Sequence, residues 1–195
     1  MTKRIVLARH GATEWSEAGR HTGRTDLPLL PLGESQARAL GLALAQESFV
    51  QVFSSPLRRA QETAKLAGFG PVMQLDELLL EMDYGQDEGR TRKEIRAERP
   101  GWDVFFAGPK GGETPHDVAA RARRFLAKCE AIEGDVLLFA HGHLIRTLTA
   151  TWLRQSPLFA SNLELGAASI SVLGYNHEHP SLQLWNDRTH LLGLT

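Results

Sequence analysis

Three short, largely apolar runs recur along the chain. They are RIVLA at residues 4–8, FVQVFSS at 49–55 and DVLLFA at 135–140. A strand with one wet face alternates apolar and polar positions, whereas a strand buried on both faces forms a nearly continuous apolar run. The pattern therefore predicts three buried strands.

Apolar residues at helical spacing fill much of the sequence between these runs. We predict helices at residues 32–46, from Ser55 to about Ala67, from Thr91 onward, from Thr114 to about Ile132, and from about Gly142 to Leu153. Between residues 10 and 31 the chain is polar and glycine-rich, which predicts a loop.

Two of the helix starts have recognisable capping residues. Ser55 followed by Pro56 has the types favoured at an N-cap and a first helical position. Thr114, Pro115 and Asp117 predict a capping box. The second of these helices has an apolar stripe that includes Cys129, so this cysteine is predicted to lie in the core.

The order of these elements indicates an α/β fold. Buried strands alternating with helices predict a mainly parallel sheet flanked by helices on both faces. At the end of the chain, SISVLGYN and SLQLWN predict a hairpin that turns on HEHP. We expect a single domain over residues 1–195, with a less regular, lid-like insertion at about 70–113.

Basic and imidazole side chains follow each predicted strand. His10 comes after the first strand, Arg58 and Arg59 after the second, and His141 after the third. Ligands bind at the carboxyl ends of the strands in sheets of this kind. We therefore expect these residues to meet at one edge, although adjacent helical positions point about 100° apart and only one arginine can face the ligand.

These side chains suit a phosphorylated ligand. Guanidinium groups bind phosphate oxygens through a planar fork, and imidazole is a competent nucleophile near neutral pH. A leaving alkoxide needs a proton, and the acidic stretch LLLEMDYGQDEG supplies the candidate donors Glu81, Asp83, Asp87 and Glu88.

Four ordered motifs resemble those of the histidine phosphatase superfamily, the phosphoglycerate-mutase-like fold. They are RHG, SSPLRRAQETA, LEMDYGQDEG and AHGH, and together they extend over nearly the whole chain. The resemblance implies a three-layer sandwich in which a histidine takes up the phosphoryl group. Matched by motif, His10 is the nucleophile, Glu81 the general acid and base, and the phosphoryl-binding residues are Arg9, Arg59 and His141.

The same resemblance implies a substrate pocket. Gly142 would lend a backbone N–H, and the other matching positions are Ser16, Thr22, Gly23 and Tyr84. The segments GRHTGRTDLPL, WDVFFAGPKGGET and FAHGHLIRTLTATWL are most similar to small sugar-phosphate and acid phosphatases, a branch that includes sedoheptulose-1,7-bisphosphatase-like enzymes. True mutases usually carry an asparagine where Ser16 stands, and a longer insertion over the site.

The implied activity is hydrolysis of small phosphorylated metabolites, such as sugar phosphates or phosphoglycerates, with no cofactor and no metal. Two alternatives stay open: a cofactor-dependent phosphoglycerate mutase and a non-catalytic phospholigand-binding module. The pairs His141/His143 and His177/His179 have no carboxylate or cysteine cluster to complete a metal site. Whether the loop residues Arg20, Arg24, Arg92 and Lys110 meet a second phosphate or a carboxylate is also open.

Composition narrows the expected partners. Lys and Arg total 22 against 23 Asp and Glu, a net charge of −1, which gives no reason to expect nucleic acid or a membrane surface as a partner. A single cysteine excludes an internal disulfide and suits a reducing compartment. The start Met1-Thr2-Lys3-Arg4 precedes an apolar run too short for a signal peptide. We expect a cytoplasmic protein whose hairpin edge could pair with a second copy.

Overall fold

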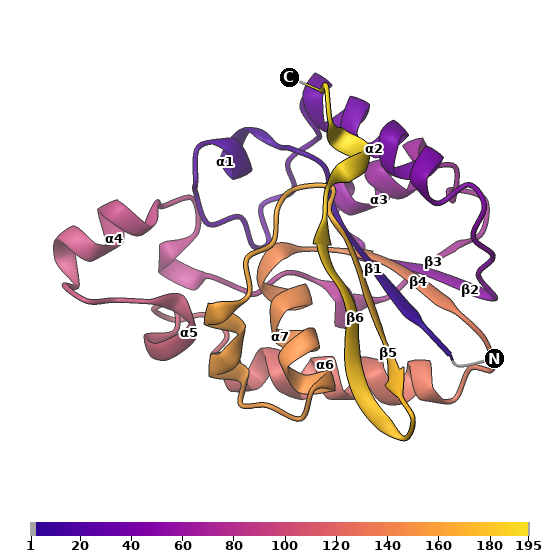
Figure 1. Ribbon diagram of the computed structural model, residues 1–195. Coiled ribbons are helices and arrows are strands. Elements are labelled where there is room, and N and C mark those ends of the chain that lie inside the picture. Colours follow the sequence, from indigo (N-terminus) through magenta and orange to yellow (C-terminus); the bar gives the residue numbers. More distant parts are fainter. Residues whose placement is uncertain (1–2, 195) are drawn as a thin grey trace.

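A six-stranded sheet runs through the middle of the computed structural model, which describes residues 3–194 (Figure 1). Met1 and Thr2, part of the start considered above, lie outside the described residues. The strand order is β3-β2-β4-β1-β5-β6. The strands are β1 (Ile5–Arg9), β2 (Gln51–Ser54), β3 (Met73–Leu75), β4 (Val136–Ala140), β5 (Ile170–Asn176) and β6 (His179–Asp187).

The first four strands are parallel, and the last two form an antiparallel hairpin. All three buried strands expected from the apolar runs are present, and so is the C-terminal hairpin. Strand β4 lies between β1 and β2, so their three carboxyl ends are neighbours at one edge of the sheet.

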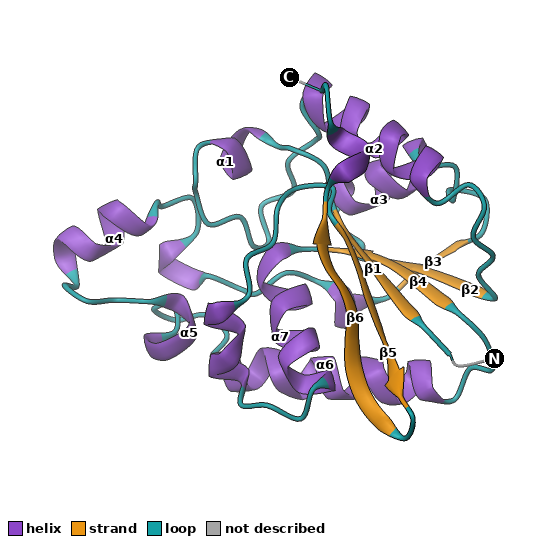
Figure 2. Ribbon diagram, in the orientation of Figure 1, coloured by secondary structure: helices purple, strands orange, loops and turns teal. Residues whose placement is uncertain are grey.

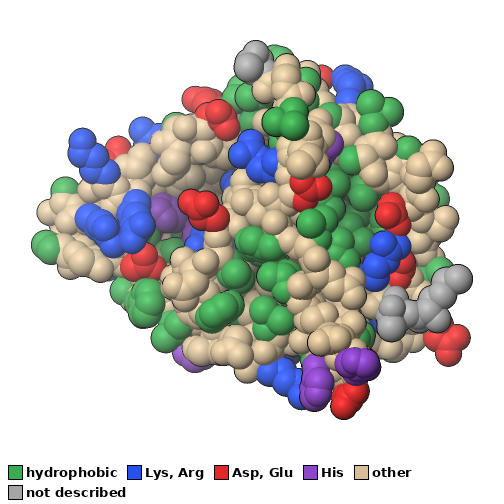
Figure 3. All heavy atoms as spheres, in the orientation of Figure 1, with side chains coloured by type: hydrophobic (Ala, Val, Ile, Leu, Met, Phe, Trp, Pro, Cys, Tyr) green, Lys and Arg blue, Asp and Glu red, His purple; other side chains and the backbone are tan. Residues whose placement is uncertain are grey.

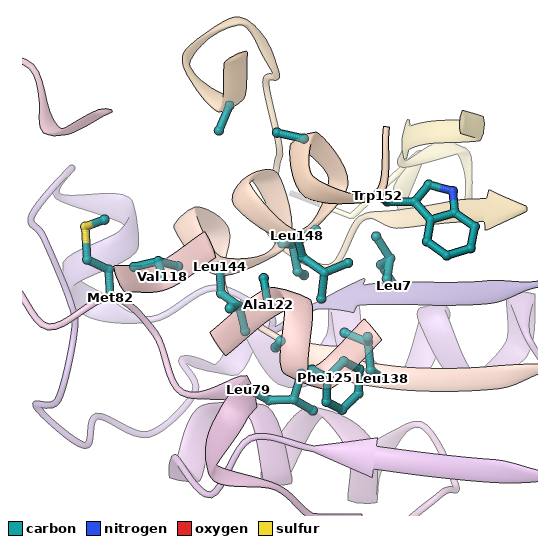
Figure 4. Close-up of a cluster of buried hydrophobic side chains, with 14 of the residues drawn as sticks. Leu7, Leu79, Met82, Val118, Ala122, Phe125, Leu138, Leu144, Leu148 and Trp152 are labelled. Atoms are coloured by element: carbon teal, nitrogen blue, oxygen red, sulfur yellow. The ribbon is translucent and has the colours of Figure 1, made fainter. Parts of the chain in front are cut away.

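Helices cover both faces of the sheet, which confirms the expected α/β architecture (Figure 2). Helices α2 (Pro31–Ala43) and α3 (Arg58–Leu66) pack on one face, and α6 (Pro115–Glu130) and α7 (Gly142–Trp152) on the other. Val6 of β1 lies in one apolar cluster with Leu40 of α2, whereas its neighbour Leu7 lies in the other cluster with Phe125 of α6. Figure 4 shows this second cluster, in which β1 and β4 meet α6 and α7.

Short helices complete the chain. They are α1 (Glu14–Glu17), α4 (Arg92–Glu98), α5 (Val104–Ala107), η1 (Glu77–Leu79), η2 (Gly85–Asp87), η3 (Pro157–Asn162) and η4 (Thr189–Leu191). Helices α4 and α5 extend away from the sheet, at the left of Figure 1. Within residues 3–194, no helix is both long enough and apolar enough to cross a bilayer.

The predicted helices are confirmed, with two differences. Helix α1 falls in a stretch predicted to be loop, where Thr13 and Ser16 form a capping box. The predicted start of α3 at Ser55 is wrong, since the helix begins at Arg58 with Leu57 as its N-cap. The hydroxyl of Ser55 accepts the Leu57 N–H at 3.3 Å and also lies 2.7 Å from Nε2 of His141.

A close backbone contact holds the loop that follows β1. A Cβ atom on Gly11 would lie 2.4 Å from the carbonyl oxygen of Gly33, and one on Gly33 would lie 2.2 Å from that of Ala12. Neither position has room for a side chain. Gln36 Oε1 also accepts the Ala12 N–H at 2.9 Å, so the backbone directly after His10 is fixed against α2.

Candidate active site

His10 lies where β1 ends, beside the end of β4. Its backbone N–H donates to the Ala140 carbonyl at 3.0 Å, and its ring centroid is 5.2 Å from that of His141. Nδ1 of His10 lies 2.8 Å from the Gly11 carbonyl oxygen. A carbonyl only accepts, so Nδ1 carries the ring proton and Nε2 keeps its lone pair.

Burial keeps this imidazole neutral. Loss of water, followed by the charges of Arg59 and Arg9, holds the pKa of His10 well below its usual value of 6.5. At neutral pH the ring is thus a nucleophile with its free nitrogen available.

His141 is held between a guanidinium and a hydroxyl. Arg59 donates its Nε–H to Nδ1 of His141 at 3.2 Å, which leaves the ring proton on Nε2. That Nε2–H donates to the Ser55 hydroxyl at 2.7 Å. The side chain is buried, and its pKa is lowered well below 6.5 by desolvation and by Arg59.

Arg59 is fully buried at the start of α3, whereas its neighbour Arg58 is exposed and pairs with Glu62. Only Arg59 of the two is directed into the interior, as expected for adjacent helical positions that point about 100° apart. Besides His141, the Arg59 guanidinium donates to the carbonyls of Thr22, Gly23 and Thr25, each at 3.0 Å. Four of its five N–H groups are used in this way, and one remains.

Arg9 points its guanidinium to the same place. Its Nη1 donates to the Leu165 carbonyl, and its buried Nε has no hydrogen-bond partner. Across residues 3–194 no carboxylate lies within 4 Å of Arg9 or Arg59. A fully buried cation, Arg59, and a partly buried one, Arg9, both without a carboxylate partner, favour an anionic ligand.

Glu81 caps the first turn of α7. Its carboxylate accepts the backbone N–H groups of Met82, His143 and Leu144, each at 2.9 Å. The N–H of Gly142, the first residue of this helix, has no acceptor within residues 3–194. A Cβ on Gly142 would lie 3.5 Å from Nε of Arg9, so Gly142 and that guanidinium are neighbours.

A cavity of about 210 Å³ opens over these groups. Seven of the ten residues predicted from the sequence line it: Arg9, His10, Ser16, Thr22, Glu81, Tyr84 and Gly142. Arg59 and His141 lie beneath the lining, in contact with each other. The backbone N–H of Gly23 donates to Glu88 at 2.8 Å, so Gly23 positions the loop from behind the cavity wall.

The cavity is also lined by residues that were not predicted from the sequence to bind substrate. His21, His143 and Arg146 line it, and so does Arg20, whose part had been left open. Space-filling shows basic and histidine side chains together on the α4–α5 side of the molecule (Figure 3). Spacing of three residues at the start of a helix places His143 and Arg146 on one face, which could have indicated both.

His143 pairs with Tyr84 inside the cavity wall. The tyrosine oxygen lies 2.6 Å from Nδ1 of His143. Burial raises the pKa of Tyr84 well above its usual value, and burial together with Arg146 lowers the pKa of His143 well below 6.5. The phenol is therefore protonated and donates to a neutral imidazole.

The chain is similar to several known proteins. The sequence matches the histidine phosphatase superfamily (branch 1) over residues 5–188. An acid phosphatase of Mycobacterium tuberculosis is 38% identical over 89% of this chain and 87% of its own. Sedoheptulose 1,7-bisphosphatase of Saccharomyces cerevisiae is 33% identical over 78% of this chain and 68% of its own. A mycobacterial glucosyl-3-phosphoglycerate phosphatase, solved with VO3, superposes with a TM-score of 0.86 at 35% identity, covering 95% of this chain and 99% of that one.

Proposed function

Because the chain belongs to the histidine phosphatase superfamily (branch 1), we propose that the cavity over β1 and β4 is its active site and His10 its nucleophile. The chain is a phosphoric monoester hydrolase that acts on small phosphorylated metabolites, of the sugar-phosphate or phosphoglycerate type, through a phosphohistidine. One observation carries the assignment of residues: a neutral His10, with its proton on Nδ1, stands beside the buried Arg59 and the partly buried Arg9, neither of which has a carboxylate partner within residues 3–194.

In the first step, Nε2 of His10 attacks phosphorus in line with the ester oxygen. A P–N bond forms while the P–O bond to the alcohol breaks, and protonated Glu81 gives its proton to the departing oxygen. Arg9 and the free N–H of Arg59 stabilise the charge on the three remaining phosphoryl oxygens. Positioning and electrostatic stabilisation dominate phosphoryl transfers of this kind.

In the second step, the Glu81 carboxylate takes a proton from a water molecule while the water oxygen attacks phosphorus. The P–N bond breaks, inorganic phosphate leaves and His10 returns to its neutral form. Glu81 is suited to this alternation, because its three backbone hydrogen bonds hold the carboxyl group at the cavity wall.

His141 and Gly142 would complete the phosphoryl site. Nε2–H of His141, which donates to the Ser55 hydroxyl at 2.7 Å here, would donate to a phosphoryl oxygen when substrate is bound. Gly142 would add its backbone N–H at the positive end of the α7 dipole. We assign Ser16, Thr22 and Tyr84 to contacts with the rest of the substrate, and Gly23 to holding that loop.

The test is to trap the intermediate. Rapid acid-free quenching with a phosphorylated substrate, followed by peptide mass spectrometry, should find an acid-labile phosphoryl group on His10. Phosphate on any other residue would overturn the assignment. With 3-phosphoglycerate as substrate, release of free phosphate rather than formation of an isomer separates hydrolysis from mutase action.

We also propose that residues 70–113 act as a lid-like part of the single domain, because Tyr84 of this segment lines the cavity. A cytoplasmic location suits the single cysteine, Cys129, which is buried as a free thiol. The exposed edge of β6, paired only with β5, supports a homodimer formed there. Light scattering of the purified chain tests this dimer.

A further inference from the structure

A second cavity of about 200 Å³ adjoins the first. His21, His143 and Arg146 line both cavities, so the second cavity lies directly beside the first. Arg92, Trp102, Asp103 and Phe105 are among the residues that line only the second cavity. The part of a substrate that remains after the phosphoryl group enters the first cavity therefore has a place to lie.

Arg146 lies where the two cavities meet and is only partly satisfied. Its Nε donates to the Ala160 carbonyl at 3.0 Å and its Nη2 to that of Ser161 at 3.4 Å. The guanidinium carbon lies 4.4 Å from the ring centroid of Phe105. Two of five N–H groups are thus used, and three remain for a ligand.

Neighbouring arginines are neutralised within the protein, but Arg146 is not. Arg92 pairs with Asp103 at 2.6 Å, and Arg20 lies 3.5 Å from Glu94. In the described part of the chain no carboxylate lies within 4 Å of Arg146. Burial lowers the pKa of Arg146, because removal from water disfavours the charged guanidinium. A bound anion would offset this loss of hydration free energy.

From this geometry we infer that the substrate carries a second anionic group, a carboxylate or a second phosphate, which Arg146 binds. This inference rests on the proposed function, in which the reacting phosphoryl group occupies the first cavity beside His10. Arg146 is then a specificity-determining residue, and a monophosphate with a neutral remainder leaves it unpaired. The planar fork suits either of the two anions.

A matched pair of substrates tests the inference. 3-Phosphoglycerate and glycerol 3-phosphate differ only in a carboxylate that replaces a hydroxymethyl group. The wild-type chain should hydrolyse 3-phosphoglycerate with the higher kcat/KM. In Arg146→Gln that value should fall about 10- to 100-fold, the range expected for a lost charge-assisted pair, with a much smaller fall for glycerol 3-phosphate. Arg38→Gln removes an exposed charge on α2 and should keep the wild-type ratio.

Two results would overturn the inference. One is that neither anion raises kcat/KM in the wild-type chain: 3-phosphoglycerate equals glycerol 3-phosphate, and a sugar bisphosphate equals the matching monophosphate. The other is an equal fall for both in Arg146→Gln, which would show that Arg146 serves only the Ala160 and Ser161 carbonyls. If Arg146→Gln does not fold, Arg146→Lys replaces it. There the preference should persist in reduced form, because a positive charge remains without the planar fork, and an equal fall in kcat/KM for both substrates would overturn the inference.

Binding measurements separate this inference from the proposed function. Calorimetry with His10→Ala compares the affinities of the two phosphates without turnover. Tighter binding of 3-phosphoglycerate that is lost in His10→Ala/Arg146→Gln supports the second anion site even if hydrolysis is never seen. Hydrolysis of both compounds without such a difference in affinity removes the second site and leaves the phosphatase assignment standing.

Discussion

The guanidinium of Arg59 sets the proton position of His141. Because Nε of Arg59 donates to Nδ1 at 3.2 Å, the N–H proton of the neutral His141 ring lies on Nε2 and faces Ser55. Since Nδ1 of His141 already accepts a hydrogen bond from Arg59, Nε2 is the nitrogen that can donate one. His141 is therefore arranged as a hydrogen-bond donor to an anion.

Replacing Ser55 with alanine tests this arrangement. The Ser55→Ala variant leaves a buried Nε2–H of His141 without its acceptor, so we expect the free energy of unfolding to fall by about 1–2 kcal/mol. Added phosphate should restore part of that loss by accepting the hydrogen. Ser54→Ala is the control, since its equally buried hydroxyl donates to the Ser55 carbonyl and touches neither histidine. Urea unfolding with and without phosphate measures both, and an equal response of the two variants would contradict the arrangement.

Removal of the nucleophile should abolish turnover. In His10→Ala we expect kcat to fall by at least about 10⁴-fold and the acid-labile phosphoenzyme to disappear, because no other imidazole in the cavity has a free Nε2 beside both arginines. The exposed residue His116 supplies a control, since His116→Ala should keep both. Near-wild-type hydrolysis in a clean His10→Ala preparation would rule out the covalent route.

The role of Glu81 depends on the leaving group. Glu81→Gln removes the proton donor, so hydrolysis of an alkyl phosphate such as 3-phosphoglycerate should slow by about 10²–10⁴-fold. p-Nitrophenyl phosphate should be affected far less in the phosphorylation step, because its phenolate leaves without a proton. Single-turnover kinetics with both substrates measures the difference.

Glu88→Gln is the matched control for this experiment. Its carboxylate also accepts two backbone N–H groups, from Gly23 and Thr25, but it does not line the cavity. We expect it to change both substrates by the same factor. A similar response in Glu81→Gln would show that Glu81 only caps α7.

Three histidines with lowered pKa values should make the unliganded fold sensitive to acid. The pKa values of His10, His141 and His143 all lie well below 6.5 in the folded chain, first because of burial. As pH falls below about 6.5 the unfolded chain binds protons that the folded chain does not, so the free energy of unfolding decreases. Each histidine contributes up to about 1.4 kcal/mol per pH unit, and this loss is absent above that pH. Urea titrations from pH 7.5 to 5.0 measure it, and a flat profile between pH 6.5 and 5.5 would contradict it.

Chelation should leave the activity intact. Arg9, Arg59 and the N-terminus of α7 supply the positive charge that a divalent ion provides in other phosphatases. Activity after dialysis against EDTA should equal that before it, with no gain on adding Mg²⁺, Mn²⁺ or Zn²⁺. Strict dependence on an added ion would overturn the mechanism.

Much of this structure was predictable because its signals are local or periodic. Apolar runs identify the buried strands, and the carboxyl ends of parallel strands bring His10 and His141 together. Ser55 shows the limit: its sequence context is that of an N-cap, but a histidine 86 positions later competes for its hydroxyl. The role of Arg146 could not be predicted from the sequence either. It depends on the distance from its guanidinium to each carboxylate, which is known only in the folded chain.

The central position of β4 affects the order in which the sheet can fold. Strands β1 and β2 each pair with β4 and not with each other, so the sheet edge that brings His10 and Arg59 together requires residues 136–140 between them. The pairing of β1 with β4 joins residues about 130 positions apart, and such long-range pairings form slowly during folding.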